Sequence, residues 1–122
     1  MLRNFFAGVF FAVFITQAKS ENYVIELKNN TFNPEVLYIP AHKKIKIKII
    51  NFDPEPEEFD SFDLNREKVL FPNKPATIYI GPLAPGEYFY FGEFHPNIAK
   101  GKMIATDTDV DHADKMGTGD AD

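Results

Sequence analysis

The sequence predicts an all-β domain, an antiparallel β-sandwich or barrel. Short runs rich in β-branched and aromatic residues recur along the chain, and Pro, Gly and Asn residues separate them. One run, Lys44–Ile49, alternates lysine with isoleucine at a period of two. Residues 21–106 contain no convincing helical periodicity. Seven or so short strands joined by frequent turns are typical of antiparallel sandwiches and barrels.

Length and composition limit what the protein can be. The 122 residues leave room for one domain, and a hydrophobic content of 44% with 13 Phe and 5 Tyr can supply a packed core. The net charge of −5 argues against a nucleic-acid partner, because phosphate binding requires clustered Lys and Arg. The chain has no cysteine, so any metal must be held by oxygen and nitrogen. No Ser-His-Asp set, phosphate-binding loop or thiol nucleophile is visible, which argues against a hydrolase.

Residues 1–20 are interpreted as a signal peptide. Arg3 supplies a positive start, Phe5 to Ile15 is an uncharged apolar run, and small residues around Ala18 and Ser20 offer cleavage sites. The apolar run is short for a membrane span. We therefore expect export to the periplasm with a mature chain that begins near residue 19 or 21. An uncleaved anchor is the alternative.

The first half of the domain predicts three strands. Asn29-Asn30 indicates a turn between the first two. In the third strand the isoleucines face the core and the lysines face water. The lysine row is a solvated face that also resists edge pairing, or else a docking surface. The predicted strands are Tyr23–Leu27, Val36–Ile39 and Lys44–Ile49.

The second half predicts three more strands: Ala76–Ile80, Glu87–Phe91 and Met103–Ala105. A Pro-Gly turn precedes the aromatic strand, and its Tyr88 fits a tyrosine corner, in which the hydroxyl bonds a nearby backbone group. His42 and Asn73 are interpreted as turn residues. The acidic stretch beside Pro54 and Pro56 is interpreted as a loop. Residues 107–122 predict a disordered acidic tail, because they offer almost nothing apolar to bury.

Residues 23–106 resemble a cupredoxin-like domain, which implies a Greek-key β-sandwich over residues 21–106. The motifs that carry the resemblance are Phe32-Asn33-Pro34-Glu35, Pro82–Tyr88 and His95-Pro96 through Lys100-Gly101. A finer resemblance points to the periplasmic cupredoxin-like domains of EfeO-type and FtrB-type bacterial iron-uptake systems. Its motifs are Glu58-Phe59-Asp60-Ser61, Arg66-Glu67-Lys68-Val69 and Gly92-Glu93-Phe94-His95-Pro96.

The chain departs from ordinary blue-copper proteins at the metal ligands. A blue site uses two His, one Cys and a weak axial Met. Here the second histidine is matched by His95. The first falls at Glu57 or Glu58, the cysteine falls near Gly92, and the methionine falls near Ile98 or Ala99. A copper–thiolate centre is therefore impossible.

One imidazole and several carboxylates remain as candidate metal ligands. Glu93 and His95 are two residues apart and share a strand face if the aromatic strand continues that far. Such a set favours copper(II) on intrinsic affinity, with iron as the second candidate because oxygen ligands suit it. A solvated acidic loop without metal is the alternative interpretation. The predicted ligands are His95, Glu93, Glu58, Glu67 and Glu57, with Asp60 and Asp63 nearby in sequence.

The resemblance implies a periplasmic protein that binds copper or iron and serves ferrous iron uptake. The protein is interpreted as a binding protein in preference to an enzyme. Assistance in the oxidation of ferrous iron is the alternative role. The implied partners are a metal ion and a periplasmic iron-binding protein or inner-membrane iron permease. The alternative is a metal-free β-sandwich adaptor that docks another periplasmic protein through the lysine face or the acidic end.

Overall fold

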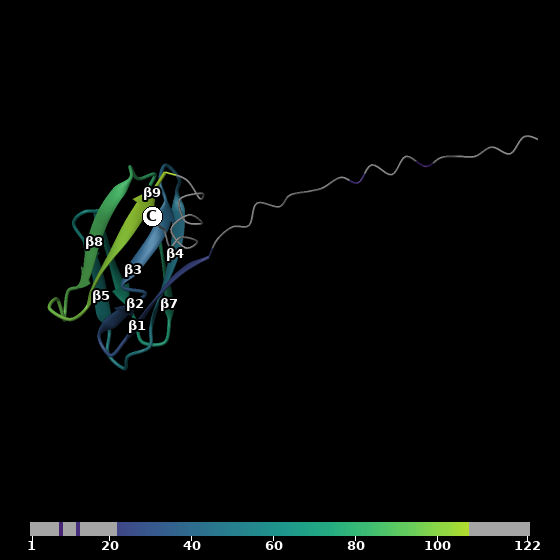
Figure 1. Ribbon diagram of the computed structural model, residues 1–122. Coiled ribbons are helices and arrows are strands. Elements are labelled where there is room, and N and C mark those ends of the chain that lie inside the picture. The colour runs from purple at the N-terminus through teal and green to yellow at the C-terminus, as the bar shows by residue number, and fades with distance from the viewer. Residues whose placement is uncertain (1–7, 9–11, 13–21, 108–122) are drawn as a thin grey trace, which may run out of the picture.

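The computed structural model describes residues 8, 12 and 22–107 (Figure 1). Most of the predicted signal peptide and residues 108–122 of the predicted tail lie outside the described residues. The described part folds as nine strands without a helix, and so it holds no helix long and apolar enough to span a bilayer. The strands are β1 (Tyr23–Lys28), β2 (Thr31–Asn33), β3 (Val36–Pro40), β4 (Ile45–Asn51), β5 (Glu57–Ser61), β6 (Arg66–Leu70), β7 (Pro75–Ile80), β8 (Gly86–Gly92) and β9 (Lys100–Thr106).

The strands form two sheets that pack face to face, which confirms the predicted all-β sandwich. One sheet has the order β2-β1-β4-β7 and the other β3-β9-β8-β5-β6. Most neighbours are antiparallel, but β1 pairs with β4 and β3 pairs with β9 in parallel. The core lies between the sheets. Its largest fully buried apolar side chains are Tyr90, Phe32, Phe59, Ile25, Leu27, Ile39, Ile47, Ile49, Leu70, Ile80 and Met103.

The predicted alternation of β4 is confirmed. Ile45, Ile47 and Ile49 are buried, and Lys46 and Lys48 are exposed. The suggested role of the lysines in resisting edge pairing is wrong, because β4 lies inside its sheet between β1 and β7. The periodicity of one strand fixes which residues face water, but it does not say which strand is at the edge.

The predicted turns are also confirmed. Asn29, Asn30, His42 and Asn73 all have positive φ angles, between 54° and 64°. Asparagine tolerates this left-handed conformation better than most residues, because its short side chain can bond nearby backbone. These turns join consecutive strands of the chain without a glycine at the left-handed position.

The tyrosine corner is confirmed at the start of β8. The Tyr88 hydroxyl donates a hydrogen bond of 2.7 Å to the backbone oxygen of Ala84. This bond ties the strand to the Pro-Gly turn that precedes it. Tyr88 is therefore a structural residue.

The interpretation of residues 57–60 as a loop is wrong, because they belong to β5, which forms a hairpin with β6. Glu57, Phe59 and Ser61 face the core, whereas Glu58 and Asp60 lie on the outer face. The alternation is hidden in the sequence because acids occupy both faces of this strand. A buried glutamate breaks the pattern by which a strand is normally recognised.

Candidate metal centre

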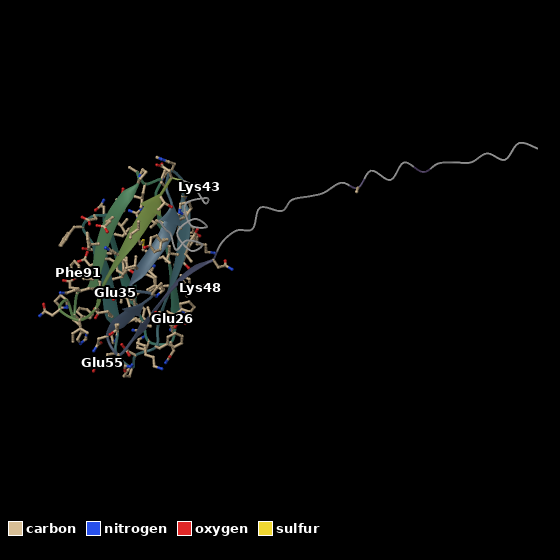
Figure 2. All side chains as sticks on the ribbon, in the orientation of Figure 1. Glu26, Glu35, Lys43, Lys48, Glu55 and Phe91 are labelled. Carbon is tan, nitrogen blue, oxygen red and sulfur yellow. The ribbon has the colours of Figure 1, made fainter. Side chains whose placement is uncertain are left out.

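A tight turn follows β8 and returns the chain to β9. The N–H of Ala99 donates to the oxygen of His95 at 2.9 Å, and the N–H of Gly92 donates to the oxygen of Ala99 at 2.8 Å. Figure 2 labels Phe91, which precedes this turn on β8. The turn brings the side chain of His95 into contact with that of Glu57, the first residue of β5, at one end of the sandwich.

The carboxylate of Glu57 lies at this contact between β5 and the turn. Its side chain is only 2% exposed. One carboxylate oxygen, Oε1, accepts hydrogen bonds from the N–H groups of Glu58 and Phe94, each at 2.8 Å. The other, Oε2, lies 2.9 Å from Nδ1 of His95. A buried carboxylate is costly without such partners, and two of the three, from Phe94 and His95, hold β5 against the turn.

Gly92 and Ala99 complete the packing around the Glu57 carboxylate. A Cβ atom on Gly92 would lie 2.7 Å from Cδ and Oε2 of Glu57 and 2.8 Å from Cβ of Ala99. Of the alternatives that the sequence left open, Glu57 and Ala99 face inward, whereas Ile98 is 58% exposed. The four positions that match blue-copper ligands therefore do converge, but the glutamate carboxylate fills the space between them.

A second group of acids lies on the outer face of the same sheet. Asp60 is paired with Glu67 on β6 and with Phe91 on β8. The backbone N–H of Glu93 donates to the backbone oxygen of Glu58 at 2.9 Å, which places Glu93 beside β5. We call Glu58, Asp60, Glu67 and Glu93 the acidic face.

These acids repel one another. Partial burial raises the pKa of the Glu58 carboxyl above its ordinary value of 4.5, and the charges of Glu93, Glu67 and Asp60 raise it further. A hydrogen bond between the carboxyl groups of Glu58 and Glu93 acts in the same direction. The carboxyl of Glu58 therefore keeps its proton to a higher pH than an ordinary glutamate does.

The raised pKa of Glu58 predicts a pH dependence of stability. The folded protein holds this proton more tightly than the unfolded chain does. The resulting stability is fully present below pH 4.5 and is lost as the pH rises through the raised folded pKa. We expect the unfolding temperature of the metal-free protein to fall more steeply over this range than that of Glu58→Gln. Identical pH profiles for the two proteins in thermal unfolding would contradict this expectation.

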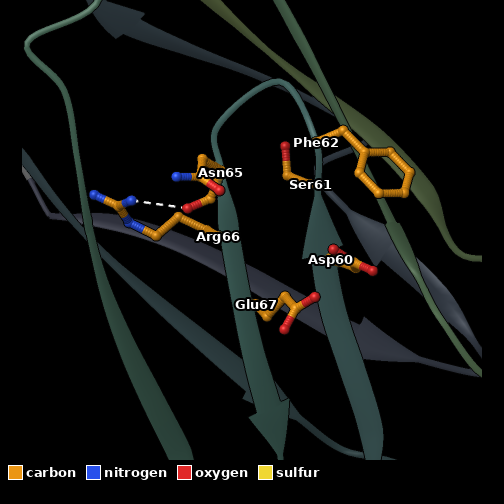
Figure 3. Close-up of a pocket in the computed structure, with 6 residues that line it drawn as sticks. All are labelled: Asp60, Ser61, Phe62, Asn65, Arg66 and Glu67. Atoms are coloured by element: carbon orange, nitrogen blue, oxygen red, sulfur yellow. Dashed lines mark hydrogen bonds between the residues drawn. The ribbon is translucent and has the colours of Figure 1, made fainter.

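The nearest arginine does not neutralise the acidic face. Nε of Arg66 donates to the backbone oxygen of Tyr79, and its Nη1 donates to the backbone oxygen of Asn65, both at 2.9 Å. Figure 3 shows Arg66 reaching to Asn65 and away from Asp60 and Glu67. A shallow pocket is lined by Asp60, Ser61, Phe62, Asn65, Arg66 and Glu67.

The structure divides the five predicted ligands into two groups. Glu57 and His95 meet in the interior, whereas Glu58, Glu67 and Glu93 belong to the acidic face. The aromatic strand ends at Gly92, so the condition for a shared strand face of Glu93 and His95 is not met. Among the described residues, no three His, Cys, Asp or Glu side chains are arranged to hold a metal ion. The ligand set therefore stays a prediction.

The sequence predicts only that Asp60 lies near the candidate metal ligands, and not that it shares a face with them. Asp60 is 7% exposed and lies between Phe91 and Glu67. Its spacing of two residues from Glu58 is the signal that could have placed both acids on one face, had β5 been recognised as a strand.

Comparisons with known proteins agree with this architecture. A family model described as a cupredoxin-like domain matches residues 4–105. The "Uncharacterized protein RP394" of Rickettsia prowazekii (strain Madrid E) is 41% identical over 83 residues, which are 68% of this chain. The chain spans about two thirds (66%) of that relative's length.

Two solved structures show the same fold at low sequence identity. Auracyanin A, a "blue" copper protein from Chloroflexus aurantiacus, has a TM-score of 0.61 at 12% identity, covering 70% of this chain and 98% of its own. A purple cupredoxin from Nitrosopumilus maritimus has a TM-score of 0.56 at 20% identity, covering 70% of this chain and 100% of its own. The family match and the shared sandwich lead to one conclusion: the chain belongs to the cupredoxin-like domain family.

Proposed function

We propose that this protein is a periplasmic metal-ion-binding protein that serves ferrous iron uptake and handles iron or copper(II) without a type 1 blue-copper centre. The observation that supports it best is the acidic face, where partial burial and neighbouring acids raise the pKa of Glu58. Within the part of the chain that the structure describes, Asp60 and Glu67 form no ion pair with a basic side chain. Carboxylate oxygens are ligands suited to iron and other harder cations.

The interior position fits a resident copper ion poorly. The carboxylate of Glu57 already satisfies two backbone donors and lies against Nδ1 of His95. Gly92 offers no side-chain ligand there, and the chain has no thiolate. Copper(II) held by carboxylates would have no intense blue absorption band, because that band requires a copper–thiolate bond. Oxygen ligands also favour copper(II) over copper(I), which argues for metal binding and not for electron transfer.

A growth experiment tests the role in iron uptake. We expect a deletion strain to grow poorly when ferrous iron is scarce and is the only iron source, because the carboxylates of the acidic face would no longer present the ion for transport. A copy of the gene with Glu87→Gln should restore growth, since Glu87 pairs with Lys102 outside the acidic face. A copy in which Glu58, Glu67 and Glu93 are all changed to Gln should not. Normal growth of the deletion strain would contradict the role.

One observation favours a second candidate function, a metal-free adaptor that docks another periplasmic protein. The three hydrogen bonds of the Glu57 carboxylate close the interior position without any ion. Phe94 and Ile98, in the same turn as His95, are 55% and 58% exposed and offer an apolar contact surface. Metal analysis of the protein purified without chelators, followed by titration with copper(II) and iron(II), separates the two functions. An absence of bound metal and of measurable affinity would select the adaptor.

A further inference from the structure

The outer face of the four-stranded sheet carries positive charge without a counter-charge in the described domain. We call Lys44, Lys46 and Lys48 the lysine face, and all three side chains are exposed. Lys46 and Lys48 lie on the outward side of β4, and the Nζ atom of Lys44 lies 5.2 Å from the centre of the Tyr79 ring on β7. Within residues 22–107, no lysine of this face forms an ion pair with an acid.

The neighbouring strands do not neutralise the lysine face. The cross-strand neighbours recorded for Lys46 and Lys48 on β1 and β7 are uncharged. The acid of β1 on this side of the sheet, Glu26, is paired with Ile50 and not with a lysine. In Figure 2, Lys43 lies higher on the side of the domain where Lys48 and Glu26 are labelled. Like charges two residues apart on one strand face repel each other, so this surface favours an anionic occupant.

The described chain ends beside the start of this surface. The N–H of Ala41 donates to the backbone oxygen of Thr106 at 2.6 Å, and Nε2 of His42 lies 3.0 Å from Oδ1 of Asp107. These contacts hold the end of β9 against the turn that leads into β4. Because Lys44 follows His42 by two residues, the chain after Asp107 continues from a point close to the lysine face.

The residues that follow have the charge and the spacing to match. Residues 108–122, which we call the acidic segment, contain five aspartates and one lysine. Aspartates recur at every second position from 107 to 111, which is also the spacing of the lysines along β4. In an extended chain this spacing places side chains on one side, about 7 Å apart. The fifteen residues of the acidic segment can span up to about 50 Å, roughly twice the length of the seven-residue β4.

We propose that the lysine face is the docking surface for the acidic segment of the same chain. The aspartates of residues 109–114 pair with the three lysines, and the segment lies across the outer face of the sheet. It contacts side chains and does not join the sheet, since β4 already has a strand on each side. This inference is independent of metal handling. A docked segment covers a surface that the metal-free adaptor would use, so an acidic partner has to displace it first.

Docking depends on several ion pairs that form together. A single exposed ion pair contributes little, because water screens it and two long side chains lose freedom. Here the acidic segment is tethered at the start of the lysine face, which gives its aspartates a high effective concentration there. The screening length falls from about 10 Å in 0.1 M salt to about 3 Å in 1 M salt, so the docked segment should dissociate as salt is added.

The test is NMR spectroscopy of the isotope-labelled mature protein that carries a nitroxide spin label on Gly119→Cys. The substitution supplies the only thiol of the chain, so the label has one site. We expect the label to broaden the amide signals of β4 and of Tyr79 more strongly than those of β8, which lies in the opposite sheet. Addition of about 1 M NaCl should remove this difference.

Matched lysine variants are the decisive comparison, because even an undocked segment approaches the end of the domain from which it starts. The double variant Lys46→Gln, Lys48→Gln should lose the broadening in the middle of β4. The double variant Lys68→Gln, Lys100→Gln removes two exposed lysines of the other sheet and should keep it. A carbodiimide, which couples carboxylates to amines that touch them, should link residues 109–114 to the lysine face in the unlabelled wild type.

Three outcomes would overturn the inference. Equal broadening in the two double variants would show that the lysines do not hold the segment. Broadening of isotope-labelled wild type by a spin-labelled, isotope-free copy in a mixture would make the occupant a second copy of the chain. If the wild type lacks the broadening at β4 and its β4 signals shift when vesicles of phosphatidylglycerol are added, the occupant is an anionic membrane surface.

Discussion

Replacement of Glu57 with alanine is expected to lower the free energy of unfolding by about 3 kcal/mol. The substitution removes the acceptor for the N–H groups of Glu58 and Phe94 and the partner of His95 Nδ1. It also leaves a cavity beside Gly92 where the carboxylate was packed. Lost partners and an unfilled cavity are the two changes that make core substitutions costly.

Urea denaturation of the wild type, Glu57→Ala and Glu57→Gln measures this effect. Glutamine keeps the shape and one acceptor oxygen for the two backbone donors, so we expect Glu57→Gln to lose much less stability than Glu57→Ala. The comparison separates the packing of the side chain from its charge. A Glu57→Ala protein within about 1 kcal/mol of the wild type would show that the pair does not hold the turn, since typical hydrogen-bond losses reach that size individually.

The second large effect is expected for Gly92→Ala, a loss of about 2 kcal/mol, which is typical of overpacking a well-filled interior. The new methyl group would lie 2.7 Å from the Glu57 carboxylate and 2.8 Å from Cβ of Ala99, and real Cβ atoms do not approach so closely. The Glu57 side chain cannot simply rotate away, because its three hydrogen bonds hold it. The turn after β8 has to move instead.

A double-mutant cycle identifies the cause of the Gly92→Ala effect. In the Glu57→Ala background the carboxylate is gone, and only Ala99 still crowds the new methyl group. We therefore expect Gly92→Ala to cost clearly less there than in the wild type, with a coupling of about 1 kcal/mol between contacting residues. Additive losses would mean that Gly92 is required for its backbone alone. The same crowding predicts that Gly92→Cys by itself creates no blue-copper site.

Several features could be predicted from the sequence because they depend on local physics. The alternation in β4, the left-handed turns at Asn29 and Asn73, and the tyrosine corner at Tyr88 each involve residues close together in the chain. The resemblance to cupredoxin-like domains placed Gly92 at the end of the aromatic strand, whereas His95 lies in the turn that follows it. The fold class followed from the spacing of strands and turns.

The class of fold, the absence of a thiolate and the set of available acids can all be read from the residues alone. Which acid faces the interior depends on the phase of one strand, and long-range strand pairing fixes that phase. Glu57 and Glu58 are identical residues, so no pattern of side chains says which one faces inward. The pairing of β5 with β6 and β8 fixes that phase, and a shift of one residue would exchange every inward side chain for an outward one. That pairing buries Glu57 against His95 and gathers Glu58, Asp60 and Glu67 on the outer face, at contacts between segments far apart in the chain.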